Sequence, residues 1–183
     1  MEGLSSLRSL RSLWLGKNKI ERIEGIEELT ALRQLDVQSN RLTAISGIQT
    51  LSQLEELYLA SNAIESIEGI PTAGSLSTID LSRNKLSSLA GIEVQTSLED
   101  LWLSTNLFTT FDFLEHLREL TALSTIYMEH NPIASDFEYR IRVSAALPRL
   151  EFIDATMTTA GRQRPQVAYT SSTPVVAPPG TTV

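Results

Sequence analysis

Residues 54–62 read LEELYLASN, and this spacing of three leucines and a closing asparagine decides the fold because it returns along the chain. The same spacing of apolar residues and Asn is found, without gaps, in LRSLWLGKN (10–18), LRQLDVQSN (32–40), LSTIDLSRN (76–84), LEDLWLSTN (98–106) and LSTIYMEHN (123–131). Successive closing asparagines lie 22 residues apart four times and then 25 apart. Such a period indicates a stack of similar coils, each of which buries its leucines against its neighbours.

Each coil is expected to contain one short strand and one return segment. In LEELYL, Leu57 and Leu59 are two residues apart and therefore point inward together, whereas Glu56 and Tyr58 point outward. Apolar residues after the asparagine, such as Ile64, close the opposite wall. The pattern predicts a right-handed α/β solenoid of leucine-rich repeats, with 22-residue coils and a concave parallel sheet.

The asparagine that closes each strand is expected to be structural. Its amide can pair with main-chain groups that are left without partners where the chain turns inside the solenoid. Leaving such a buried group unpaired costs about 1–3 kcal/mol, which is reason enough for the asparagine to recur.

Three parts are expected along the chain. Residues 1–131 form about six leucine-rich repeats, the first of them incomplete, and residues 132–157 form a C-terminal cap. Apolar residues after Pro132 recur at helical spacing, so we expect a helix that covers the hydrophobic end of the stack. Residues 158–183 are rich in Gly, Pro, Ser and Thr and are expected to be a disordered tail.

No comparable cap is expected at the N-terminus. Leu4, Leu7 and Leu10 resemble the end of a preceding coil, so we expect this chain to be the C-terminal part of a longer solenoid. The alternative is that residues 1–9 fold over the first coil as an improvised cap.

The outward-facing strand residues are the candidate binding surface. Their central column alternates large aromatic side chains with carboxylates and contains no basic residue. Aromatic anchors are enriched at interface hot spots, and aromatic residues that only shield a sheet would not explain the interleaved carboxylates. We therefore expect a protein partner that offers basic and apolar groups. The candidate partner-binding residues are Trp14, Asp36, Glu56, Tyr58, Asp80, Asp100, Trp102 and Tyr127.

Composition argues against several other functions. A net charge of −7 disfavours nucleic acids and anionic membranes, and no apolar run is long enough to span a bilayer. The chain has no cysteine, and its two histidines, His116 and His130, share no metal-ligand spacing. Asp36 and Asp80 could form a carboxylate pair, but an open sheet offers no enclosed pocket for catalysis. We therefore expect a non-enzymatic protein with no metal, cofactor or small-molecule substrate. It is expected to be monomeric on its own and intracellular, in the nucleus, the cytoplasm or both.

The ordered set of coils resembles the leucine-rich-repeat regulatory subunit 7 of type-1 serine/threonine protein phosphatase. The resemblance covers about residues 4–157. It is carried by LWLGKNKI (13–20), VQSNRLT (37–43), ELYLASNAIESIEGI (56–70) and YRIRVSAALPRLEFIDAT (139–156), the last of which is similar to the end cap of that family.

The resemblance implies a non-catalytic subunit that holds the phosphatase catalytic subunit against its concave face. The family's aromatic and acidic binding column matches this chain at Trp14, Asp80, Asp100, Trp102 and Tyr127, while Asp36, Glu56 and Tyr58 lie on the same face. Family members have further N-terminal coils that also contribute contacts. The alternative is a leucine-rich-repeat scaffold for an unrelated partner, such as an axonemal motor chain or a splicing-factor subunit.

Overall fold

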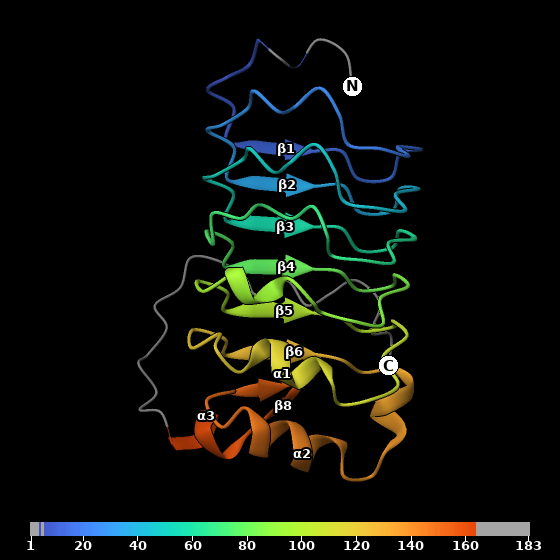
Figure 1. The fold of residues 1–183 in the computed structure, drawn as a ribbon, viewed down its shortest axis with the longest axis vertical. Helices are drawn as coiled ribbons and strands as arrows, with labels where there is room; N and C mark the ends of the chain where they lie inside the picture. Colours follow the sequence, from blue (N-terminus) through green and yellow to red (C-terminus); the bar gives the residue numbers. More distant parts are fainter. Residues whose placement is uncertain (1–3, 5, 164–183) are drawn as a thin grey trace.

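One continuous stack of coils makes up the computed structural model, which describes residue 4 and residues 6–163 (Figure 1). Each of the first six coils contributes one three-residue strand: β1 (Ser12–Trp14), β2 (Gln34–Asp36), β3 (Glu56–Tyr58), β4 (Thr78–Asp80), β5 (Asp100–Trp102) and β6 (Thr125–Tyr127). These strands pair in parallel and in sequence order. The predicted solenoid of stacked parallel coils is therefore confirmed.

The hydrophobic core lies between the sheet and the return segments. The central residue of each of these six strands is buried: Leu13, Leu35, Leu57, Ile79, Leu101 and Ile126. Leu59 is also buried, as are Ile64 and Ile67 from the return segment of the same coil. Because every coil packs these side chains against the next, the burial that stabilises the fold is mostly between neighbours.

Most return segments are irregular, but two of them contain a short helix. η1 (Ile92–Val94) lies in the fourth coil, and α1 (Phe113–Leu117) lies in the fifth. The fifth coil is the one whose asparagine interval is 25 rather than 22. Its extra length accommodates the helical turn, which buries Phe113, Leu114 and Leu117 against the core. The sequence pattern alone did not predict this helix.

The C-terminal end of the stack has a different architecture. After η2 (Pro132–Ser135), α2 (Tyr139–Ala146) lies at the end of the stack and buries Tyr139 and Val143 (Figure 1). β7 (Phe152–Ile153) continues the parallel sheet, and β8 (Thr156–Met157) turns back antiparallel to it. Thr158 is buried and α3 (Thr159–Gln163) follows, so ordered structure continues past the expected boundary at residue 157. The rest of the expected tail lies outside the described residues.

The closing asparagines form a hydrogen-bonded ladder through the solenoid. Asn106 donates from Nδ2 to the carbonyl oxygens of Leu81 (2.9 Å) and Leu103 (3.0 Å), and its Oδ1 accepts the N–H of Leu86 (2.9 Å). The same pattern links Asn40, Asn62, Asn84 and Asn131 to the coil before each of them. The predicted structural role of these asparagines is confirmed.

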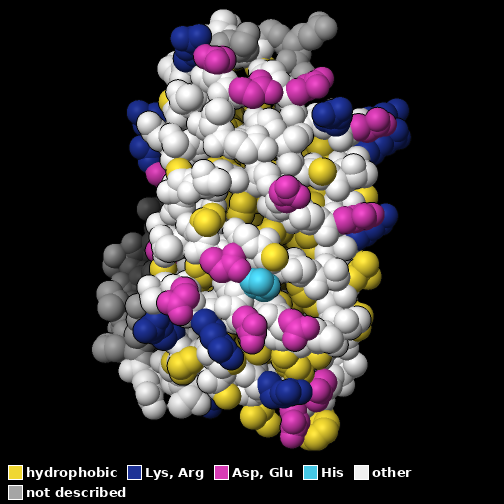
Figure 2. Space-filling model, viewed as in Figure 1, with side chains coloured by type: hydrophobic (Ala, Val, Ile, Leu, Met, Phe, Trp, Pro, Cys, Tyr) yellow, Lys and Arg dark blue, Asp and Glu magenta, His cyan; other side chains and the backbone are white. Residues whose placement is uncertain are grey.

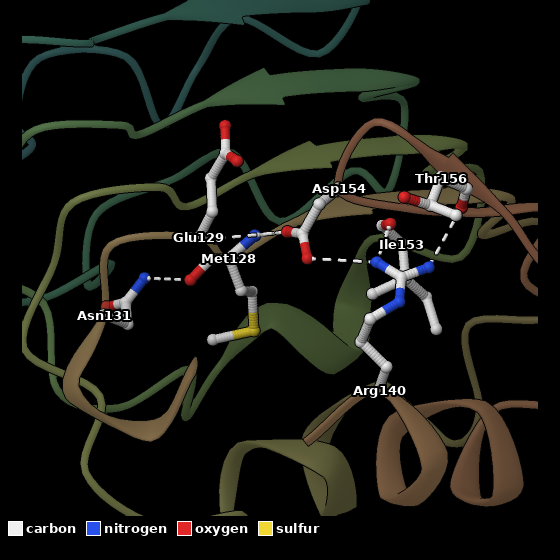
Figure 3. A network of polar contacts seen from close by, with 7 residues as sticks. All are labelled: Met128, Glu129, Asn131, Arg140, Ile153, Asp154 and Thr156. Atoms are coloured by element: carbon white, nitrogen blue, oxygen red, sulfur yellow. Dashed lines mark hydrogen bonds and ion pairs between the residues drawn. The ribbon is translucent and has the colours of Figure 1, made fainter. Parts of the chain in front are cut away.

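Asp154 closes the C-terminal end of the parallel sheet (Figure 3). Its Oδ1 accepts the N–H groups of Met128 (2.8 Å) and Glu129 (3.0 Å), and its Oδ2 lies 3.4 Å from Nη1 of Arg140. One coil earlier, the N–H of Leu103 donates instead to the carbonyl oxygen of Tyr127 in the next coil. The carboxylate of Asp154 therefore replaces the main-chain carbonyl that accepts the equivalent bond one coil earlier.

Candidate functional site

Strand register places all eight candidate residues on one side of the sheet, which we call the sheet face. Strand pairing aligns six of them in one column: Trp14, Asp36, Tyr58, Asp80, Trp102 and Tyr127. Glu56 and Asp100 lie in the adjacent column, two strands apart, with Thr78 between them. The register therefore brings together residues that are up to 113 positions apart in the sequence.

Aromatic side chains divide the sheet face into two parts. The rings of Tyr58 and Trp102 lie 6.4 Å apart between centroids, and those of Trp102 and Tyr127 lie 6.3 Å apart in an edge-to-face arrangement. These three rings form an aromatic cluster over β3 to β6. Trp14 stands apart at β1 and is 66% exposed. The cluster offers a preformed apolar surface, whereas Trp14 offers a free anchor.

Asp80 differs from the expectation that its carboxylate is open to a partner. The rings of Tyr58 and Trp102 approach each other across β4, and Asp80 between them is only 5% exposed. Its Oδ1 accepts the N–H of Ser82 at 2.9 Å. Burial raises the pKa of Asp80, the nearby Asp36 adds to the rise, and the hydrogen bonds from Ser82 oppose it. The expected accessibility of Asp80 is therefore wrong, although its position in the column is as expected.

The other carboxylates of the sheet face are half-buried. The hydroxyl of Tyr58 donates to Oε2 of Glu56 at 2.8 Å, and Oδ1 of Asp36 accepts the N–H of Gln38 at 2.8 Å. Burial raises the pKa of Tyr58, and the Glu56 carboxylate raises it further, so this hydroxyl remains a donor at neutral pH. These contacts hold acceptor oxygens in place at the surface.

Glu129 is a further acidic residue that the candidate set did not include. It lies two residues after Tyr127 and is half-buried, and its charge contributes to the raised pKa of Tyr127 after burial itself. Its position two residues after Tyr127 of the central column was the feature of the sequence that could have identified it as part of the sheet face. With Glu129, the negative charge of the sheet face extends to its C-terminal end.

Among the residues that the structure describes, no group of three or more His, Asp or Glu side chains is placed to hold a metal ion. Within residues 6–163, no helix is both long and apolar enough to cross a bilayer.

Sequence and structure comparisons agree on the family. A model described as "Leucine-rich repeat" matches residues 31–172, which is most of the chain, and a model for two copies of the repeat matches residues 8–49. This chain belongs to the leucine-rich-repeat family. No curated protein matches this leucine-rich-repeat chain significantly.

Similar solved structures are larger leucine-rich-repeat proteins of bacteria. A leucine-rich-repeat protein of Leptospira interrogans has a TM-score of 0.71 and 26% identity, covering 81% of this chain and 38% of its own. Internalin C2 of Listeria monocytogenes has a TM-score of 0.67 and 25% identity, covering 82% and 63% respectively. An internalin F of the same organism has a TM-score of 0.67 at 21% identity, covering 82% and 42%. A leucine-rich-repeat solenoid of this kind is a scaffold suited to protein binding.

Proposed function

We propose that this leucine-rich-repeat protein is a non-catalytic regulatory subunit that binds the catalytic subunit of type-1 serine/threonine protein phosphatase through the sheet face. The observation that carries the proposal is the composition of that face. Its two columns bring together the aromatic cluster, Trp14 and several carboxylates, and they contain no basic residue. The resemblance of the coils and of residues 139–156 to regulatory subunit 7 favours this partner over others.

The size of the sheet face suggests where the binding energy lies. Six strands about 4.8 Å apart and about five residues of exposed chain give roughly 400 Å² in projection. A standard interface buries about 800 Å² on each partner, so this face is a partial footprint. A small footprint depends on a few anchors, and Trp14 and Trp102 are the largest side chains available.

Capture of the phosphatase tests the proposal directly. The full chain is immobilised, and binding of purified catalytic subunit is measured for wild type, Trp14→Ala and the double variant Trp14→Ala with Trp102→Ala. We expect the double variant to lose about tenfold or more in affinity, because hot-spot aromatics typically contribute at least that much. Trp14 is largely exposed, so its truncation should leave the fold intact.

A matched control separates the sheet face from general loss of apolar surface. Phe137 and Leu107 are 91% and 51% exposed and lie outside the two columns. The double variant Phe137→Ala with Leu107→Ala should bind as wild type does. Equal binding by all variants would remove the sheet face from the proposal. Absence of the phosphatase among proteins captured from lysate, with another protein bound through the same tryptophans, would favour the unrelated-partner alternative.

Charge is tested separately from apolar contact. Asp36→Asn with Asp100→Asn removes two carboxylates from the sheet face, and Glu68→Gln with Glu119→Gln removes two exposed ones elsewhere. We expect the first pair to slow association and weaken its salt dependence, because complementary charge acts mainly on the encounter rate. The second pair should change the association rate far less.

A further inference from the structure

A groove runs along the C-terminal part of the solenoid, away from the sheet face. Its middle is a cavity of about 200 Å³ between the end of α1 and the segment that joins α2 to β7. The walls include Leu117, Leu120, Leu123 and Leu150, all of which are buried core residues, and the side chains of Arg118 and Arg149 complete the lining. We call this feature the C-terminal groove.

Two neighbouring hollows extend the middle cavity into a groove. One of them, of about 460 Å³, shares Arg118 and Ala146 with the cavity and continues between α1 and α2. The other, of about 520 Å³, shares Leu123 and Arg149 with it. Such an elongated shape suits an extended chain better than a compact small molecule.

The middle of the groove carries positive charge on an acidic protein. Arg118 and Arg149 are exposed, and neither side chain forms an ion pair or hydrogen bond with another residue among those described. By contrast, Arg33 and Arg140 are paired with carboxylates. No carboxylate lines the middle cavity. Figure 2 shows hydrophobic side chains gathered toward the lower end of the molecule, among basic and acidic ones.

We propose that the C-terminal groove binds a short segment of a protein partner in which one apolar side chain is flanked by Asp or Glu. The apolar side chain enters the middle cavity, whose size is comparable to cavities that hold one benzene-sized group. The flanking carboxylates meet Arg118 and Arg149, whose guanidinium groups suit bidentate pairing with carboxylates.

The charges at the two ends of the groove limit where acidic residues are placed. Asp112 and Glu115 line one outer hollow together with Arg142, and Glu99 and Glu151 line the other, so acidic side chains are favoured only beside the apolar anchor. Residues 164–183 contain no Asp or Glu, so this segment of the chain itself lacks the required chemistry. The occupant that we propose is a separate protein, and this site is additional to the sheet face.

Peptide binding to the full chain tests the proposal. The probes are fluorescent nonapeptide pools with a central Leu, Phe or Trp between Asp and Glu residues. Matched pools carry Asn and Gln in place of the acids, or Ala in place of the central residue. Wild type should bind the acidic apolar pool about tenfold or more tightly than either matched pool, since both the charge and the anchor contribute.

Protein variants locate the binding. Arg118→Gln with Arg149→Gln should weaken binding of the acidic pool about tenfold or more, whereas Arg11→Gln with Arg22→Gln removes the same charge elsewhere and should change it less than about twofold. Ala146→Leu should also weaken binding, because it narrows the groove and leaves its charge unchanged. Equal binding of acidic and amide pools, or equal loss in both arginine pairs, would overturn the proposal. So would an absence of binding by wild type.

Discussion

Asn106 in the middle of the stack and Asp154 at its C-terminal end serve similar main-chain groups with different chemistry. Asn106 donates to two carbonyl oxygens and accepts one N–H, all from its own coil and the preceding one. Asp154 accepts the N–H groups of Met128 and Glu129, the two residues that follow β6, and it faces the guanidinium of Arg140 (Figure 3).

The difference reflects what each position leaves unpaired. Between two coils the turn exposes both carbonyl and N–H groups, so an amide, which donates and accepts, is the suitable side chain. At the last coil the ladder leaves N–H groups, so an acceptor-only carboxylate suits them, with Arg140 to balance its charge. Inside the stack a carboxylate could still accept the N–H group, but it could not donate to the two carbonyl oxygens.

The largest effect is expected for Asn106→Ala. The substitution leaves the carbonyl groups of Leu81 and Leu103 and the N–H of Leu86 without their partner in a site that is 4% exposed. We expect the free energy of unfolding to fall by about 3 kcal/mol, measured by urea denaturation. Asn106→Asp should not restore it, because a carboxylate cannot donate. Wild-type stability of either variant would contradict the role assigned to the ladder.

A smaller loss is expected for Asp154→Asn. The amide oxygen can still accept from Met128 and Glu129, but the charge opposite Arg140 is lost. We expect a decrease of about 1–2 kcal/mol in the free energy of unfolding. Asp136→Asn is the control, because Asp136 accepts a similar main-chain bond but lies 3.8 Å from the more exposed Arg142. A loss in the control as large as that of Asp154→Asn would show that the sheet end is not special.

Replacing Asp80 by Asn is expected to raise the free energy of unfolding, whereas the same change at Asp154 lowers it. Folding raises the pKa of Asp80 above its ordinary 3.8, mainly through burial, so the folded state holds the anion less well than the unfolded state does. The free energy of unfolding therefore falls as the pH rises through the raised pKa. Asp80→Asn should stabilise the protein by about 1 kcal/mol at pH 7 and by much less below the ordinary carboxyl pKa. Thermal unfolding at the two pH values measures this, and destabilisation at neutral pH would show that the anion is stabilised in place.

The smallest effect is expected for Asn18→Ala. Asn18 is exposed, and among the residues that the structure describes its side chain donates only to Leu15 and Gly16 of its own coil. We expect a change of less than about 0.5 kcal/mol in the same urea experiment. A loss comparable to that of Asn106→Ala would show that the bonds within a coil, rather than those between coils, account for the contribution of the ladder.

The arrangement of the coils could be predicted from the sequence because the pattern that defines each coil lies within one short stretch of residues. The apolar positions of Leu57 and Leu59 and the asparagine position of Asn62 recur with the same spacing in the first six coils, and alternation along a strand sets which side chains face inward. The membership of the sheet face followed from the same alternation. The helix α1 did not follow, because the longer interval before Asn131 shows added length but not its conformation.

Which side chains of the sheet face are accessible, and how the C-terminal end of the stack is closed, depend on contacts between coils. No local pattern shows that the rings of Tyr58 and Trp102 meet across β4 and cover Asp80, because the two residues lie 44 positions apart. The pairing of Asp154 with Met128 and Arg140 likewise joins three separate segments.

The sequence by itself determined the period, the parallel stacking and the chemistry of each column, because a 22-residue repeat places equivalent residues in equivalent positions. Only the tertiary structure decided which of those side chains a partner can reach and how the last coil ends. Both depend on side chains from different coils that come together when the stack forms, and the free energy of those contacts is absent from any single repeat.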